Sequence, residues 1–276
     1  MPLGRRSDGD LVRDLHPVRR IMPYLMPTRT ECFVLCRQCI EMAPIRAFLE
    51  SANRGRPADA AITPFHLLLR AIARAMHEYP RLNRFLAGGR LYQRRGVWLS
   101  LSGKKAMTES GALFTTKRMY PVGESLEEMV DALYGKLSVG RSEVETTTDK
   151  EVGLLLRLPG PMLRTVMWLA RVLNNLNLLP AAMIESDPMF ASAFIANLGS
   201  VGIDACYHHN YEYGSIPIFV TMGKVHRAPV VVDEDRLEVR EVFEVKYTYD
   251  ERIEDGFYCA RGLEFVKHLL ENPHEL

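Results

Sequence analysis

The turn that decides the fold lies near the end of the chain and reads Asp250-Glu251-Arg252-Ile253-Glu254-Asp255-Gly256. It follows an alternating segment, residues 237–249, and precedes an apolar segment with helical spacing, residues 257–270. The alternation predicts a strand and the helical spacing predicts a helix, so charged groups lie where a strand turns into a helix. Because α/β proteins place their chemistry at such strand ends, this stretch indicates both a fold class and a candidate site.

Composition excludes several classes of protein. The chain has 276 residues, of which 47% are hydrophobic, and this is enough for one large buried core. A net charge of +1 gives no reason to expect nucleic acid or an anionic membrane as a partner. No apolar run is long enough for a transmembrane segment, and residues 1–10 lack the apolar core of a signal peptide. Five cysteines, an odd number, fit a reducing cytoplasmic location.

The order of the segments predicts one domain after a short arm. Residues 1–20 are basic and contain Pro and Gly, which indicates a loose N-terminal arm, and residues 21–276 form the domain. Thr63 and Pro64 start a helix with a regular apolar face. Strands and helices alternate elsewhere without a regular βαβ repeat. We therefore expect an α/β fold of two layers, with a mixed sheet covered by helices.

An apolar insertion covers about residues 150–180. Within it, residues 162–179 carry apolar side chains at helical spacing, while Arg164 and Arg171 exclude a membrane span. The simpler interpretation is an additional layer of the core. The alternative is a hydrophobic lid, an acyl-chain groove, or a surface for an acyl carrier or protein partner.

Four sequence anchors resemble one enzyme family. They are residues 62–83, a helix followed by Glu-Tyr-Pro-Arg-Leu-Asn; 197–203, Asn-Leu-Gly-Ser-Val-Gly-Ile; 217–224, Pro-Ile-Phe-Val-Thr-Met-Gly-Lys; and 250–256. In this order they resemble the chloramphenicol acetyltransferase and dihydrolipoyl acyltransferase (2-oxoacid dehydrogenase acyltransferase) catalytic domains. The resemblance implies a homotrimer with active sites between subunits. It also implies a coenzyme A thioester or carrier-protein thioester as substrate, with no covalently bound cofactor.

The chain departs from this family at both catalytic groups. Glu251 stands in the place of the histidine that acts as general base, and a carboxylate is a weaker base than an imidazole. Ala196 stands in the place of the hydroxyl residue that stabilises the oxyanion, and losing such a donor costs about 10²–10³ in rate. Arg252, Asp255 and Gly256 are retained. The resemblance implies that Arg252 pairs inward with Asp255, that Gly256 permits the turn, and that Glu251 lies at the mouth of the cleft.

Other residues are candidates to replace the missing groups. Ser200 lies four residues after Ala196, next to Asn197 of the second anchor, and offers a hydroxyl. His208 and His209 lie in a polar aromatic loop, Tyr-His-His-Asn-Tyr-Glu-Tyr, at a presumed subunit junction. They either supply the base or pack against their symmetry mates.

The cysteines do not predict a metal site. Cys32, Cys36 and Cys39 have the spacing of an iron–sulfur motif, which needs a loop that brings three thiolates together. Here they fall in a predicted strand, where Cys39 faces away from the other two. We therefore expect no metal.

Three functions remain open. The first is an acyltransferase whose rewired site uses Glu251 or the histidine pair as base. The second is a catalytically inactive homotrimer that acts as a scaffold or regulatory protein. The third is different acid/base chemistry in the same cleft, dehydration or hydrolysis, with Glu251 as the acid or base.

Overall fold

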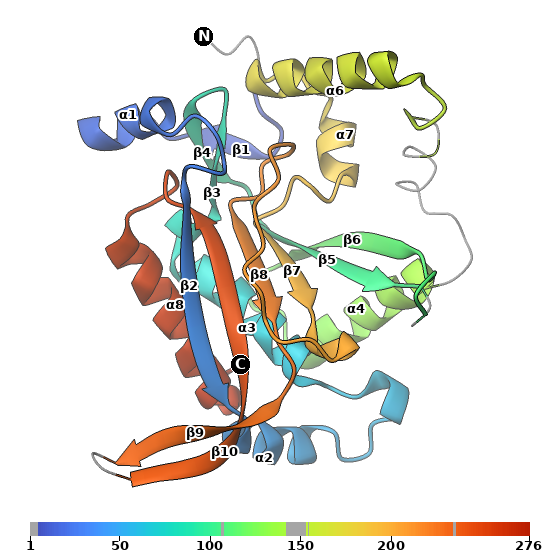
Figure 1. Cartoon of the computed structure of the whole chain (residues 1–276), viewed down its shortest axis with the longest axis vertical. Coiled ribbons are helices and arrows are strands. Elements are labelled where there is room, and N and C mark those ends of the chain that lie inside the picture. The colour runs from blue at the N-terminus through green and yellow to red at the C-terminus, as the bar shows by residue number, and fades with distance from the viewer. Residues whose placement is uncertain (1–4, 106–107, 142–152, 154, 234–235) are drawn as a thin grey trace.

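The structure, a computed structural model, describes residues 5–105, 108–141, 153, 155–233 and 236–276. Figure 1 labels its helices and strands. Their bounds are β1 Gly9–Leu11, α1 Pro17–Leu25, β2 Phe33–Glu41, α2 Met42–Ala52, α3 Pro64–Glu78, β3 Arg84–Ala87, β4 Arg90–Arg94, β5 Val97–Lys104, β6 Leu113–Tyr120, α4 Leu126–Arg141, α6 Gly160–Asn175, α7 Ala181–Ser186, β7 Ala193–Asn197, β8 Ile218–Met222, β9 His226–Asp233, β10 Arg236–Asp250 and α8 Gly256–Glu271.

The main sheet is mixed, as predicted. Among the described residues its strands follow the order β2-β10-β8-β7-β5-β6, and β9 pairs with the outer part of β10. The β5–β7 and β7–β8 pairs are parallel and the other pairs are antiparallel. β10, the 15-residue strand that ends at Asp250, lies between the edge strand β2 and β8 and carries the junction quoted above at its end.

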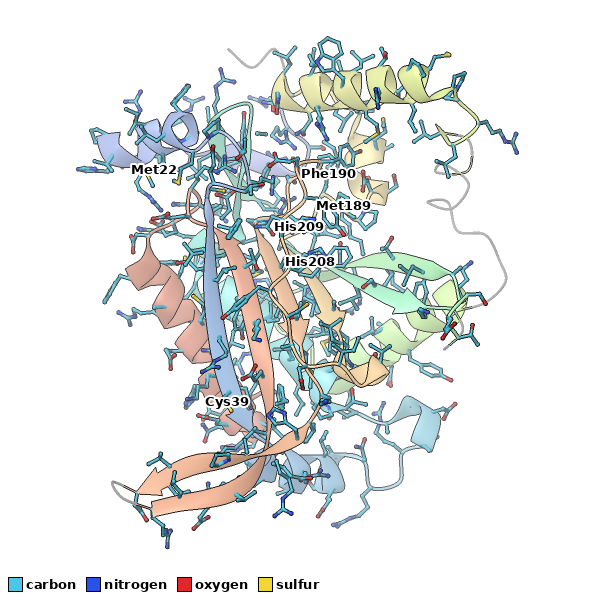
Figure 2. The ribbon with its side chains drawn as sticks, in the orientation of Figure 1. Met22, Cys39, Met189, Phe190, His208 and His209 are labelled. Carbon is cyan, nitrogen blue, oxygen red and sulfur yellow. The ribbon has the colours of Figure 1, made fainter. Side chains whose placement is uncertain are left out.

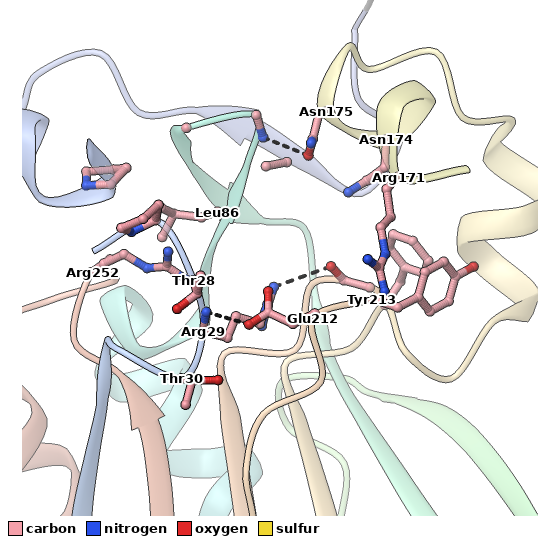
Figure 3. A pocket seen from close by; sticks show the side chains of 17 residues that line it. Thr28, Arg29, Thr30, Leu86, Arg171, Asn174, Asn175, Glu212, Tyr213 and Arg252 are labelled. Atoms are coloured by element: carbon pink, nitrogen blue, oxygen red, sulfur yellow. Dashed lines mark hydrogen bonds between the residues drawn. The ribbon is translucent and has the colours of Figure 1, made fainter. Parts of the chain in front are cut away.

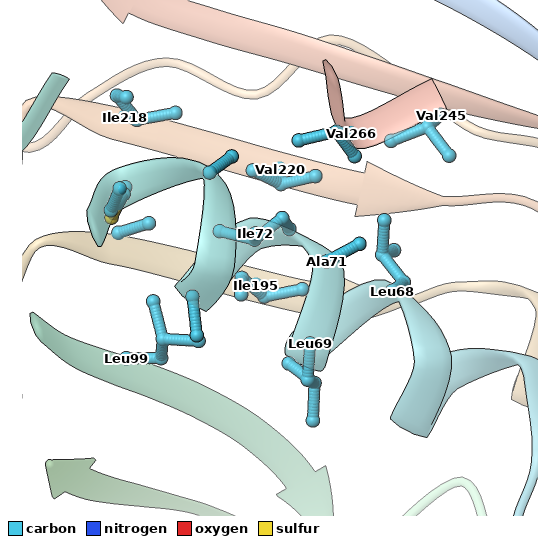
Figure 4. Close-up of a cluster of buried hydrophobic side chains, with 14 of the residues drawn as sticks. Leu68, Leu69, Ala71, Ile72, Leu99, Ile195, Ile218, Val220, Val245 and Val266 are labelled. Carbon is cyan, nitrogen blue, oxygen red and sulfur yellow. The ribbon is translucent and has the colours of Figure 1, made fainter. Parts of the chain in front are cut away.

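Helices α3 and α8 cover one face of this sheet (Figure 1). α3 begins with a capping box in which Thr63 and His66 exchange hydrogen bonds. Its apolar face, including Leu68, Leu69 and Ile72, packs over the sheet (Figure 4). These side chains are almost fully buried, so the hydrophobic effect holds the two layers together. The predicted two-layer α/β fold is confirmed.

A small second sheet joins the N-terminal arm to the domain. β1 pairs with β4, which pairs with β3. The Arg6 guanidinium is buried, forms an ion pair with Asp8 and donates to the carbonyl and side chain of Asn174 in α6. The described part of the arm is thus docked rather than loose, and the expected boundary at residue 20 falls inside α1.

The apolar insertion forms a helix but not a core layer. α6 spans Gly160–Asn175, and Asn174 is its single buried residue. The first part of the expected insertion, residues 150–152 and 154, lies outside the described residues. Trp168 and Leu169 are exposed, so the prediction of an added core layer is wrong. Periodicity identified the helix, but it does not report whether a second element covers the apolar side.

Candidate functional site

A buried ion pair fixes the turn after β10. Both carboxylate oxygens of Asp250 accept hydrogen bonds of 2.8 Å from Arg252, and Arg252 Nη1 donates to the Met26 carbonyl at 2.7 Å. Asp250 is 1% exposed and Arg252 is 5% exposed. The predicted pairing of Arg252 with Asp255 is therefore wrong. Asp250, two residues before the arginine, brings its carboxylate to the same side of the turn.

Asp255 caps the helix that follows. Its Oδ1 accepts a hydrogen bond of 2.9 Å from the backbone N–H of Tyr258, and this bond holds the pKa of Asp255 below its ordinary value. Gly256 begins α8 without a left-handed backbone, and a Cβ placed there would meet only the Tyr249 hydroxyl at 3.9 Å. The structure thus shows no steric reason for a glycine at this position, contrary to the expectation that Gly256 permits the turn.

Glu251 is half-buried and lies in the turn between the strand end at Asp250 and the helix cap at Asp255. Its backbone N–H donates to the Cys32 carbonyl at 2.8 Å, which joins the turn to the start of β2. Burial raises the pKa of the Tyr249 phenol, and the Glu251 carboxylate is among the charges that add to this shift. Tyr249 packs in the core beneath the helices. Because side chains alternate along an extended chain, Glu251, two residues after the core residue Tyr249, continues on the helix-covered side of β10.

Glu254 is an organising residue that the sequence did not single out. Its buried carboxylate forms ion pairs with Arg84 at 2.7 Å and with Arg19 and Arg81 at 3.5 Å. These arginines come from β3, α1 and the turn before β3, so one carboxylate connects three distant segments to the junction. The only sequence signal is an acidic residue between apolar Ile253 and the helix cap.

His208 and His209 lie on the opposite, open face of the sheet (Figure 2). The His208 ring stacks on Phe219 of β8 with 3.9 Å between ring centroids, and the two histidine rings stack at 4.6 Å. His208 Nδ1 lies 2.8 Å from the His209 carbonyl oxygen. The His209 ring is exposed, and among the described residues it contacts the rings of His208 and Tyr211. Within one subunit, the structure thus places the histidine pair and Glu251 on different sides of the sheet.

The Asn197 turn is closed by its own hydrogen bonds. Ser200 N–H donates to Asn197 Oδ1 at 3.2 Å, and Ser200 Oγ donates to the Asn197 carbonyl at 2.7 Å. Ser200 therefore uses its hydroxyl proton within the turn. The spacing of Ser200 from Ala196 in the sequence does not reveal this local bond.

Ala196 lies on the open face in an apolar cluster. It packs with Phe194 and Phe219, near the stacked histidines. Thr221, its partner on β8, donates its hydroxyl to the Cys206 carbonyl at 2.5 Å. The position that bears a hydroxyl in the resembling family thus has no such group here, and the neighbouring threonine is engaged elsewhere.

A pocket of about 570 Å³ opens beside the junction (Figure 3). It is bordered by Thr28–Thr30, the β3–β4 turn, the end of α6, residues 212–214 and Arg252. Arg29 donates its backbone N–H to Glu212 at 2.8 Å and its guanidinium to Gly214 at 3.3 Å. Arg171 reaches into the same pocket from α6. Three guanidinium groups, those of Arg29, Arg171 and Arg252, and one carboxylate, that of Glu212, lie on its wall, and Arg252 is already paired with Asp250. Neither Glu251 nor the histidine pair lines it.

The cysteines follow the predicted strand pattern. Cys32 is buried, Cys36 packs against the core and Cys39 is exposed. In the part of the chain that the structure describes, no three His, Cys, Asp or Glu side chains are grouped to hold a metal ion. Every helix in that part is too short or too polar to span a bilayer.

The fold is that of the chloramphenicol acetyltransferase class. A probable dihydrolipoamide acetyltransferase from Listeria monocytogenes aligns with 96% of this chain and 95% of its own, at a TM-score of 0.59 and 16% identity. A chloramphenicol acetyltransferase aligns with 95% of this chain and 99% of its own, at a TM-score of 0.52 and 14% identity. The cubic core of a pyruvate dehydrogenase multienzyme complex gives a TM-score of 0.61 at 16% identity, over 96% of this chain and 93% of its own.

Residues 186–276 match the model of the 2-oxoacid dehydrogenases acyltransferase family (catalytic domain). The lipoamide acyltransferase component of a branched-chain α-keto acid dehydrogenase complex from Bacillus subtilis is 23% identical over 217 residues. That match covers 78% of this chain, and the chain spans 40% of the length of this relative. The C-terminal third thus matches this family's model, and the resemblance predicted from the sequence is confirmed.

Proposed function

We propose that the chain is an acyltransferase that moves acyl groups from a coenzyme A or carrier-protein thioester at a site shared between subunits of a homotrimer. One observation carries this proposal. The strand–turn–helix junction keeps an ordered Asp250–Arg252 pair and an Asp255 cap, and it holds Glu251 half-exposed where the family has its base. Asp250, Glu254 and Asp255 already make the ion pairs and the cap that hold the junction together, and the Glu251 carboxylate takes part in none of these contacts.

An inter-subunit arrangement reconciles Glu251 with the histidine pair. They lie on different sides of the sheet in one subunit, but the resembling enzymes combine the strand-end residue of one subunit with the open face of its neighbour. In that arrangement Glu251 would approach the neighbour's His208 and His209 beside Ala196. A carboxylate that orients an imidazole and stabilises its charged form is an established way to strengthen a histidine base.

The chemistry then needs two proton transfers. The His209 imidazole takes the proton from the acceptor thiol, and the thiolate attacks the carbonyl carbon of the donor thioester. The tetrahedral intermediate collapses, the bond to the donor sulfur breaks, and that sulfur takes the proton back from the imidazolium. Ala196 provides no donor to the oxyanion, so we expect slower turnover than in enzymes with a hydroxyl there.

A catalytically inactive scaffold is the second candidate. The engaged hydroxyls of Ser200 and Thr221 and the apolar surroundings of Ala196 favour it. Both candidates keep the homotrimer, so only activity separates them.

Turnover of acyl thioesters tests the proposal. Purified protein is incubated with acyl-coenzyme A esters of different chain length and a dithiol acceptor, and free and acylated products are followed by mass spectrometry. We expect transfer above the uncatalysed rate with at least one ester and slow transfer with acetyl-coenzyme A and dihydrolipoamide. No transfer with any ester would favour the scaffold.

The assembly is tested separately. Light scattering should give three times the 31.4 kDa mass of the chain. A stable monomer across micromolar concentrations would contradict the shared site.

A further inference from the structure

Helix α6 presents an uncovered apolar side. Met162, Val166 and Leu169 lie at i, i+4 and i+7 on one stripe, and all three are exposed. Trp168, which is 62% exposed, lies at the edge of this stripe. Such a large apolar area on a surface indicates a binding partner rather than a solvated helix.

The last turn of α6 attaches this helix to the domain. Asn174 accepts hydrogen bonds from Arg6, and Asn175 Oδ1 accepts one from the Gly88 N–H at 3.1 Å. A Cβ at Gly88 would lie 2.2 Å from the Asn175 carbonyl oxygen, so the β3–β4 turn approaches the helix closely. These contacts leave the outer side of α6 free.

Helix α1, at the same end of the molecule, also exposes apolar side chains. Among its described residues none is buried, and Val18, Ile21, Tyr24 and Leu25 are exposed. Pro23 of α1 and the end of α6 border the same pocket, and Figure 1 places both helices across one end of the fold. The two helices therefore lie at one end of the fold on either side of this pocket, and we call their exposed sides together the α1/α6 surface.

The charges on this surface have one sign. Residues 155–184 contain Arg157, Arg164 and Arg171 and no Asp or Glu, and α1 adds the exposed Arg20, while its Arg19 is already paired with Glu254. A second copy that met this surface with the same surface would bring arginines against arginines without a carboxylate to pair with them. A bilayer with anionic lipids offers apolar depth for the stripe and phosphates for the arginines, and Trp and Tyr favour its interface. The net charge of +1 is a sum over the whole chain and does not reveal this local excess of positive charge.

We propose that the α1/α6 surface docks the protein on an anionic membrane, with both helices lying in the headgroup region. The pocket bordered by both helices then opens beside the lipid surface. This inference does not depend on the proposed acyl transfer.

Vesicle co-sedimentation of the full chain tests it. The probes are phosphatidylcholine vesicles with and without phosphatidylserine. We expect binding to the anionic vesicles, weaker binding to neutral ones, and loss of the difference at high salt. Replacing both Trp168 and Leu169 with serine should weaken binding by at least about tenfold, because two buried apolar side chains are lost.

The matched control replaces Leu113 and Val122 with serine, since both are at least as exposed but lie on and after β6. It should bind like the wild type. A Trp98→Phe protein leaves Trp168 as the sole tryptophan, and its fluorescence should shift to the blue on binding. The proposal is overturned if anionic vesicles do not bind, or if the control loses as much affinity. It is also overturned if the serine pair changes the assembly mass instead, because a second copy would then cover the surface.

Discussion

Replacing Glu251 with glutamine should lower the turnover number for acyl transfer by about 100-fold or more, because the imidazole then loses the carboxylate that orients it and stabilises its charged form. Glutamine keeps the shape of the side chain but removes its charge. The Michaelis constant should change little, because Glu251 does not line the pocket beside the junction. Steady-state kinetics on the best ester measures both constants.

Removing the histidine pair should lower the turnover number by a similar factor. A variant with His208→Ala and His209→Ala removes the proposed base, and the single His209→Ala change should account for most of the effect because His208 is stacked on Phe219. Glu50→Gln and His274→Ala, both at exposed positions, are the controls and should keep the wild-type rate. Whichever variant keeps its rate eliminates that group from the site.

Removing Arg252 should lower the free energy of unfolding by about 3–5 kcal/mol, because Asp250 then stays buried without its partner. The Arg252→Ala protein also loses the hydrogen bond to the Met26 carbonyl. Urea titration at fixed protein concentration measures the change.

The matched control breaks an exposed ion pair. Arg46 and Glu241 are 2.7 Å apart with side chains about half exposed, so Arg46→Ala should cost about 0–1 kcal/mol. A change below about 1 kcal/mol for Arg252→Ala as well would show that the buried pair does not stabilise the junction.

Local signals predicted the elements well. Thr63 and Pro64 set the start of α3, and the spacing of Leu68, Leu69 and Ile72 set its buried face. Such signals act within a few residues, so the sequence contains them in full.

Long-range pairing was not predictable in the same way. Arg252 could turn toward Asp250 or Asp255, and the end of β10 decides which carboxylate it meets. Glu254 depends on Arg19, Arg81 and Arg84, which lie between 170 and 235 residues away along the chain. No sequence pattern brings those charges together before the fold does.

The apolar side of α6 was predicted correctly, but the expectation that it is buried in the core was wrong. Helical spacing has the same period whether the apolar side meets a core, a partner or a bilayer. Exposure of Trp168 is a property of the surrounding fold.

The central claim is that each site takes Glu251 from one subunit and the histidine pair from its neighbour. Co-expression of a Glu251→Gln chain and a His208→Ala/His209→Ala chain, each with a different tag, yields mixed trimers that are purified on both tags. Each mixed trimer then contains one intact site, so it should recover about one third of the wild-type activity while each parent stays inactive. Mixed trimers as inactive as their parents would show that the two groups do not meet across the subunit interface.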